Sequence, residues 1–135
     1  MNNDNVRVLD TDVTSFIFKG GESASRFLPL IRNRVAAVSF VTIGEMLHGA
    51  YIAKWSTAHV DRMMSHIREN YLVLPYTFQV TEEWARLMAA CKGATPGLND
   101  ARIAATATAY GCPVISNDAG LKRIAANYPK LTVLP

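Results

Sequence analysis

The sequence predicts an α/β domain with three layers, in which helices cover both faces of a five-stranded parallel sheet. Short apolar runs rich in β-branched residues alternate along the chain with longer stretches of helical periodicity. This alternation implies parallel pairing through right-handed crossovers, with helices on both sides of the sheet. The length of 135 residues suits one domain with its own core, and no repeat or linker divides it. We therefore expect a single domain over residues 1–135.

The predicted strands are short and apolar. They comprise residues 6–9, 35–39, 72–74, 114–116 and 131–134. Pro75 ends the third strand, and Asn117 with Asp118 forms a predicted turn after the fourth. The first strand ends at Asp10, which we expect it to present to solvent.

The helices of the first half are predicted from apolar stripes and from residues that typically begin a helix. Residues 12–18 carry one apolar stripe, which a pair of glycines ends, and Ser23 is suited to cap a short helix. Thr42 and Glu45 have the spacing of a capping box, which predicts a helix that starts at Thr42. Apolar residues in steps of three and four predict another helix over residues 57–71.

Three further helices are expected in the second half. Thr81 is followed by acidic residues that suit the first turn of a helix. Residues 99–110 are rich in alanine and apolar on nearly all sides, which predicts a buried helix packed by small residues. A short helix over residues 121–126 precedes the last strand.

The composition excludes several classes of protein. No apolar run approaches the roughly 18 residues that a membrane span needs. The polar start at residues 1–5 lacks the features of a signal peptide. Cys91 and Cys112 form no Cys-x-x-Cys pair and lie in apolar contexts, which indicates buried reduced thiols. We therefore expect a cytoplasmic protein that does not contact membranes.

Four acidic residues fall where the predicted fold has strand ends or helix starts. Asp10 follows the first strand, and Asp118 follows the fourth. Asp100 begins the buried helix, and Glu45 lies in the first turn after the second strand. In a parallel sheet, the carboxyl ends of the strands and the N-termini of the returning helices share one edge, where ligands bind. We therefore expect the four carboxylates to meet in one cleft.

Such a cluster predicts a metal-dependent reaction on phosphate. Neighbouring carboxylates repel one another, and repulsion raises their pKa values unless a cation is bound. Hard cations such as Mg²⁺ or Mn²⁺ prefer carboxylate and water ligands. One or two of them activate a water and stabilise the oxygens of an in-line phosphoryl displacement. The net charge of +3 leaves the rest of the surface basic, as a nuclease requires for flanking phosphates.

Each acid also has a structural interpretation that involves no catalysis. Glu45 suits a capping box, Asp100 suits the first turn of a helix, and Asp118 suits a turn. Asp12 suits the cap of the helix that follows it. A structural role explains Asp10 least well, because a carboxylate directly after a buried strand has no standard function there. The catalytic interpretation gains its weight from the shared edge.

Four segments have the order and spacing of a known family. They are V-L-D-T-D at 8–12, V-T-I-G-E-M-L-H-G at 41–49, N-D-A-R-I-A-A-T-A at 99–107 and P-V-I-S-N-D at 113–118. These segments resemble the PIN domain, and most of all the VapC-type toxins of bacterial toxin–antitoxin pairs. The resemblance covers essentially the whole chain.

The resemblance implies a five-stranded parallel sheet between helices and a Mg²⁺- or Mn²⁺-dependent endoribonuclease. By position, it implies that the catalytic and metal-binding acids are Asp10, Glu45, Asp100 and Asp118. Asp10 and Asp100 would be the principal metal ligands, with Asp118 nearby and Glu45 completing the site.

The resemblance also implies supporting residues and partners. Thr11 and Ser116 match small hydroxyl positions that support the site, whereas Asp12 stands where Asn or Ser is more common and adds a negative charge. The implied partners are an RNA substrate, a cognate antitoxin and a second copy of the chain. The helical pair over residues 43–71 is the candidate dimer and antitoxin surface, because its Met and Tyr side chains suit adaptable contacts.

Two alternatives remain open from the sequence. Leu9 to Val13 is also similar to the signature of haloacid-dehalogenase-type phosphatases, in which Asp10 would be the nucleophile and Asp12 an acid or base. Ser116 to Asp118 is a poor match for the distal acidic motif of those phosphatases. The second alternative is a non-catalytic RNA- or protein-binding module on the same fold, although such a role would not require all four acids.

Overall fold

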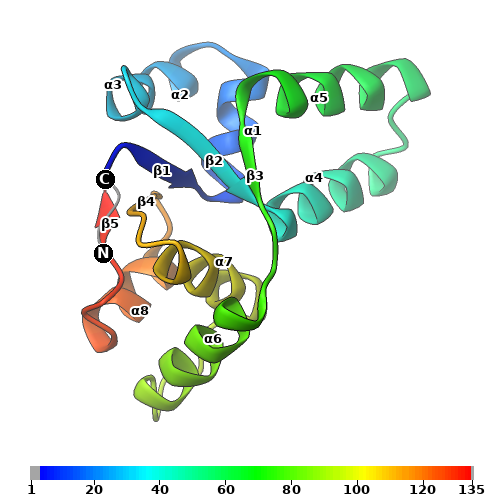
Figure 1. Ribbon diagram of the computed structural model, residues 1–135. Helices are drawn as coiled ribbons and strands as arrows, with labels where there is room; N and C mark the ends of the chain where they lie inside the picture. The colour runs from blue at the N-terminus through cyan, green and yellow to red at the C-terminus, as the bar shows by residue number, and fades with distance from the viewer. Residues whose placement is uncertain (1–3, 135) are drawn as a thin grey trace.

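The strands form one parallel sheet, as the alternation of strands and helices predicts. The computed structural model describes residues 4–134 (Figure 1). The five strands lie in the order β3-β2-β1-β4-β5, and every neighbouring pair is parallel. Their bounds are Val6–Leu9 for β1, Val35–Ser39 for β2, Leu72–Leu74 for β3, Val114–Ile115 for β4 and Val133–Leu134 for β5. Residues 1–3 of the polar start lie outside the described residues, as does Pro135.

The helices form a layer on each side of the sheet, which confirms the predicted three-layer architecture (Figure 1). The first layer contains α1 (Thr11–Lys19), α2 (Glu22–Ser25), α3 (Leu28–Ile31), α4 (Phe40–Ile52) and α5 (Thr57–Asn70). The second layer contains α6 (Phe78–Ala90), α7 (Leu98–Ala109) and α8 (Ala119–Asn127). The α4–α5 hairpin projects from the body of the domain (Figure 1).

Two hydrophobic cores lie between the sheet and the helices. Because successive strand side chains point to opposite faces, Val8 and Val114 belong to the core under α6, α7 and α8. Leu9 and Ile115 belong to the core under α1, α4 and α5. Most side chains of α7 are buried, which confirms the predicted buried, alanine-rich helix. Cys91 and Cys112 are free and buried, also as predicted.

Several helices begin a few residues before their predicted starts: Ser23 lies inside α2 and does not cap it, α8 begins before residue 121, and α4 and α6 show the cause. Helix α4 begins at Phe40, because the Ser39 hydroxyl caps it by accepting from the backbone N–H of Thr42. Helix α6 begins at Phe78, because Thr77 rather than Thr81 caps it. The last residue before α4 and before α6 supplies the cap, and the later threonine lies inside the helix. Thr42 is therefore free to contact other elements.

The order in which the chain adds strands to the sheet reverses at β1, and this reversal places the site at the ends of β1 and β4. The chain runs outward from β1 to β2 and β3, and then returns to add β4 on the other side of β1. The helices that follow β1 and β4 pack on opposite faces of the sheet, and in open α/β sheets ligands bind at such a point, outside the carboxyl ends of the strands. Across residues 4–134, each helix is too short or too polar to cross a bilayer.

Candidate active site

Four carboxylates come together at the carboxyl edge of the sheet. Asp10 directly follows β1 and caps α1, and Asp118 follows β4 and caps α8. Asp100 lies in the first turn of α7, and Glu45 lies in the second turn of α4. The charges of Asp10, Glu45 and Asp118 all act on Asp100, so the four acids share one site. We call Asp10, Glu45, Asp100 and Asp118 the acid cluster.

Asp10 is buried rather than presented to solvent, with 4% of its surface exposed. Its Oδ1 accepts from the backbone N–H of Val13 at 2.9 Å, and its Oδ2 accepts from the Ser116 hydroxyl. Burial raises the pKa of Asp10 above its usual value, and these two hydrogen bonds offset the increase only in part. The charges of Asp12 and Asp118 raise the pKa further.

Ser116 connects Asp10 to Asp118. Its hydroxyl donates to Asp10 and accepts from the backbone N–H of Asp118 at 2.8 Å. Ser116 is fully buried, so its rotamer is fixed by packing as well as by the two hydrogen bonds. These two hydrogen bonds fix the loop after β1 relative to the loop after β4. This geometry fits the supporting position that the sequence resemblance gives to Ser116.

Asp100 carries the largest perturbation in the cluster. Burial raises its pKa to about 6, with a further contribution from Asp118, whose charge repels it and whose carboxylate shares a hydrogen bond with it. Glu45 and Asp10 add smaller effects of the same sign. Burial and the three neighbouring carboxylates therefore all favour the neutral form of Asp100, and no ion pair among residues 4–134 involves an acid of the cluster.

Glu45 is oriented by a hydroxyl pair. The Thr11 hydroxyl donates to Glu45 Oε1 at 2.6 Å and lies 3.1 Å from the Thr42 hydroxyl. Thr11 begins α1 and Thr42 lies in α4, so the contact joins the helices that follow β1 and β2. Glu45 is not a capping-box partner, because Ser39 caps its helix.

Asp12 is the one predicted site residue that lies apart. It is exposed in the first turn of α1, where Asp10 rather than Asp12 supplies the cap. Within the described chain, its side chain makes no hydrogen bond with the acid cluster, and it acts on Asp10 only through its charge. The structure therefore brings together Asp10, Thr11, Glu45, Asp100, Ser116 and Asp118.

Gly120 is a site residue that the sequence analysis missed. A Cβ atom at this position would overlap Asp100 Oδ2 and would lie 3.4 Å from both Asp118 carboxylate oxygens. The Gly120 N–H also donates to Asp118 Oδ1 at 2.9 Å. A glycine two residues after a candidate ligand was the available signal. Thr42 was also missed, because the capping-box spacing offered a sufficient local explanation.

The donor set fits a hard divalent cation. All its side-chain donor atoms are oxygens, the carboxylates repel one another, and Gly120 allows the Asp100 carboxylate to lie close to Asp118. Over residues 4–134, no group of three or more His, Cys, Asp or Glu side chains is arranged to hold a metal ion as the side chains stand. Hydrogen bonds from Ser116 and Thr11 instead hold Asp10 and Glu45. A cation with several water ligands, as Mg²⁺ retains, suits this looser arrangement.

Comparison with known proteins identifies the family. The model of the PIN domain family matches residues 7–127. The chain belongs to the PIN-domain family. Ribonuclease VapC4 of Mycobacterium tuberculosis is 33% identical over 121 residues, which cover 84% of this chain and 88% of that protein. The PIN-domain resemblance predicted from the four sequence segments is therefore confirmed.

Solved structures agree with this fold. VapBC2 from Rickettsia felis, bound to a promoter DNA fragment, matches with a TM-score of 0.79 at 20% identity, covering 96% of this chain and 97% of that one. VapBC-5 from Mycobacterium tuberculosis, a member of the VapBC family of toxin-antitoxin systems, gives 0.69 at 24% identity, covering 96% and 98%. At these identities the two structures show the PIN fold alone. The family match favours the nuclease interpretation over the phosphatase one.

Proposed function

We propose that this PIN-domain protein is a Mg²⁺- or Mn²⁺-dependent endoribonuclease that cleaves RNA at the acid cluster. The observation that carries the proposal is the set of four carboxylates with no cationic partner among the described ion pairs. Dependence on a divalent metal is general among PIN-domain VapC nucleases, and the similar VapC4 protein is named a ribonuclease. The proposal joins that family property to the named residues of this chain.

The role of each acid in metal binding follows from how its side chain is held. Asp10 and Asp100 would provide the principal metal ligands, because Asp10 is fixed by Val13 and Ser116 and Asp100 has the most repulsion to relieve. Asp118 and Glu45 would complete the site, directly or through water. A bound Mg²⁺ or Mn²⁺ supplies a water of lowered pKa and positive charge for the phosphate oxygens.

Three residues act on the acids rather than on RNA. Thr11 orients Glu45, Ser116 keeps Asp10 and Asp118 in register, and Gly120 leaves room at Asp100. Removing residues that hold metal ligands in place typically changes metal affinity or activity by about 10- to 100-fold. We therefore assign Thr11 and Ser116 as positioning residues.

The decisive experiment is cleavage of total cellular RNA. We expect the wild type to cleave with Mg²⁺ or Mn²⁺ and to stop when EDTA is added. Asp10→Asn and Asp100→Asn should each lower the rate by about 100-fold or more, because they remove catalytic electrostatics while nearly preserving shape. Glu82→Gln, an exposed carboxylate on α6, is the matched control and should cleave like the wild type.

Three outcomes would contradict the proposal. Equal cleavage by all variants would show that the acid cluster is not used. Binding of RNA without cleavage in either metal would support the non-catalytic binding module. A phosphoaspartyl intermediate trapped on Asp10 would support the phosphatase alternative.

We further propose that the protein is the toxin of a toxin–antitoxin pair, acts in the cytoplasm and forms a homodimer. The solved VapBC structures to which the chain is similar include toxin–antitoxin systems. Expression without a partner protein should arrest cell growth, whereas Asp100→Asn should be harmless; harmless expression of the intact protein would contradict a toxin role.

The structure changes the expected partner surface on the α4–α5 hairpin. Met46 and Met63 are buried in the core, so they do not form the adaptable surface that the sequence suggested. Tyr51 and Ile52, at the end of α4, are the most exposed large apolar residues of the described hairpin, with 64% and 69% of their surface accessible. A partner at this hairpin would contact Tyr51 and Ile52.

A further inference from the structure

An aromatic pocket opens beside the acid cluster and shares Glu45 with it. Its volume is about 600 Å³, within the range of small-molecule sites. The residues that line it include Phe40, Glu45, His48, Tyr76, Asn99 and Arg102. Elements far apart in the sequence thus meet in this aromatic pocket: α4, the loop after β3 and the start of α7.

Phe40 and Tyr76 form the aromatic part of the pocket. Their ring centroids are 5.4 Å apart and the rings are nearly perpendicular, at 88°. The edge-to-face contact with Tyr76 restrains the Phe40 ring, yet 47% of Phe40 remains exposed. A restrained and half-exposed ring in a concavity is a ready surface for a flat ligand.

The charged part of the pocket lies next to the reacting site. Arg102 is two residues after Asp100 on α7, and His48 is one turn after Glu45 on α4. Among the described residues, the Arg102 guanidinium takes part in no ion pair, so its charge is available to a ligand. Arg102 therefore adds positive charge beside a site where four acids would otherwise repel a phosphate backbone.

We propose that the aromatic pocket binds one nucleobase of the RNA next to the scissile phosphate, stacked on Phe40, with Arg102 contacting the adjacent phosphate. This inference rests on the proposed ribonuclease function and deepens it by naming a base subsite. Proteins recognise single-stranded RNA by stacking unpaired bases on aromatic rings. The polar and charged lining favours a nucleotide over a second protein chain, since interface cores are depleted in charged residues.

Two pairs of substitutions test the aromatic pocket. Gly44 lines it, and a Cβ atom at Gly44 meets nothing within 4 Å, so Gly44→Leu should fill the space without disturbing the fold. Gly49 is equally open but lies outside the pocket lining, which makes Gly49→Leu its matched control. Phe40→Ala removes the stacking ring, and Phe78→Ala removes an exposed phenyl ring on α6 that lies outside the pocket lining.

The substrates for this test are short single-stranded RNAs, each with one abasic position near the cleaved bond. Removing one base should cost the wild type about 5- to 100-fold in kcat/KM, the range expected of one stacked base. Phe40→Ala should lose a similar factor on intact RNA and become insensitive to that same abasic position. Gly44→Leu should resemble Phe40→Ala, whereas Gly49→Leu and Phe78→Ala should resemble the wild type.

A binding measurement separates stacking from turnover. In the Asp100→Asn background, RNA carrying 2-aminopurine at the sensitive position should lose fluorescence on binding, and adding Phe40→Ala should abolish that loss. If the wild type cleaves RNA but Phe40→Ala and Gly44→Leu match their controls, the subsite is wrong while the ribonuclease stands. If the wild type does not cleave, the ribonuclease itself is wrong. A change from dimer to monomer in Phe40→Ala, seen by light scattering, would overturn the subsite in favour of a contact between two copies.

Discussion

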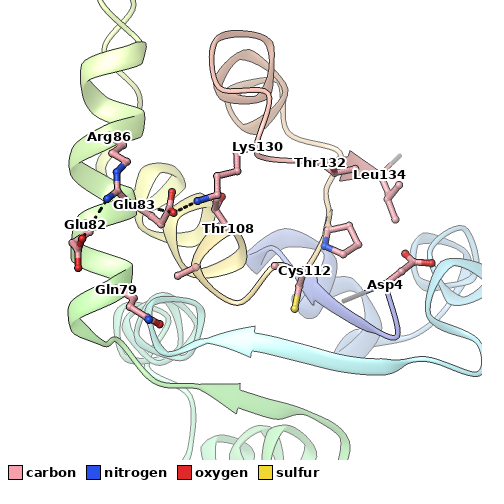
Figure 2. Close-up of a pocket in the computed structure, with 13 residues that line it drawn as sticks. Asp4, Gln79, Glu82, Glu83, Arg86, Thr108, Cys112, Lys130, Thr132 and Leu134 are labelled. Atoms are coloured by element: carbon pink, nitrogen blue, oxygen red, sulfur yellow. Dashed lines mark hydrogen bonds and ion pairs between the residues drawn. The ribbon is translucent and has the colours of Figure 1, made fainter. Parts of the chain in front are cut away.

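Two buried carboxylate sites lie at opposite edges of the sheet, and they differ in what offsets the cost of burying a negative charge. The acid cluster lies at the carboxyl ends of β1 and β4. Glu83 lies at the other edge, beside a cavity of about 590 Å³ lined by residues that precede β1, β4 and β5 (Figure 2). Glu83 is 5% exposed and Asp10 is 4% exposed, so burial alone does not distinguish them.

The two sites differ in their counter-charge. Burial alone would raise the pKa of Glu83, but hydrogen bonds from Lys130 and Tyr128 outweigh it and bring the pKa below its usual value. The Tyr128 hydroxyl donates at 2.5 Å, and an Arg86 nitrogen lies 3.5 Å from Glu83 Oε1. Figure 2 shows Lys130 and Arg86 converging on Glu83 from two sides.

The acid cluster has the opposite balance. The influences on Asp100 all raise its pKa, and the hydrogen bonds to Asp10 are too weak to reverse the effect of burial. Among the described residues, Glu83 is paired with cationic side chains, whereas the acids of the cluster take part in no ion pair, so the cluster is the site suited to bind an external cation. The comparison therefore predicts that metal, charge removal and pH act on the two sites in different ways.

The largest expected effect is stabilisation by Mg²⁺ or Mn²⁺. At a free metal concentration 100 times Kd, binding to the folded state should add about 2.7 kcal/mol to the free energy of unfolding. Asp100→Asn should lose most of this gain, whereas Glu83→Gln should keep it in full. Thermal unfolding with metal and with EDTA measures the gain. An equal gain in Asp100→Asn would mean that the metal binds elsewhere.

Removal of the charge at Glu83 should have the next largest effect. Glu83→Gln should lower the free energy of unfolding by about 2 kcal/mol, because it replaces hydrogen bonds to a charged, buried group by neutral ones. Glu82→Gln is the matched control on the preceding residue. Glu82 makes only an exposed pair with Arg86 at 3.3 Å, so its loss should cost under about 0.5 kcal/mol. Urea denaturation measures the loss of unfolding free energy in both variants. Equal losses would mean that the buried Glu83 contributes no more to stability than the exposed Glu82.

The difference between the two sites also explains what the sequence could predict. The acid cluster was predictable because each acid lies at a strand end or a helix start, and parallel topology brings those places to one edge. Glu83 was interpreted as an ordinary acid near a helix start. Its partners Tyr128 and Lys130 lie 45 and 47 residues away, and no local pattern marks them. Short-range periodicity predicts elements, whereas long-range pairing depends on how they pack.

Helix starts show the same limit at smaller scale. Several polar residues in a row can each cap a helix, and the end of the preceding element decides between them. Ser39 is the last residue of β2 and is buried, so its hydroxyl faces the first turn of α4. Thr42 then contributes its hydroxyl to Thr11 rather than to a cap. The strands and the buried helix α7 were predicted well because their apolar patterns leave fewer choices.

The smallest effect, and the clearest opposition between the sites, is the pH dependence of stability without metal. The folded pKa of Asp100, about 6, exceeds its usual value of 3.8, so the folded state binds more protons between these pH values. The free energy of unfolding should therefore fall as pH rises from 3.8 to about 6. For Glu83, whose folded pKa is lowered, stabilisation is present above the usual value of 4.5 and is lost as pH falls below it.

Asp100→Asn tests the sign of this effect directly. In EDTA at neutral pH, the variant should be more stable than the wild type by about 1 kcal/mol, a value reduced by solvent screening of the half-exposed carboxylate. The gain should vanish as pH falls below 3.8, where Asp100 becomes protonated in both states. Glu83→Gln should instead have a lower free energy of unfolding than the wild type at neutral pH, and this difference should disappear only at acid pH. If Asp100→Asn were less stable than the wild type at neutral pH, the carboxylate would be a structural element that the fold has already compensated, and the case for an external cation would lose its electrostatic basis.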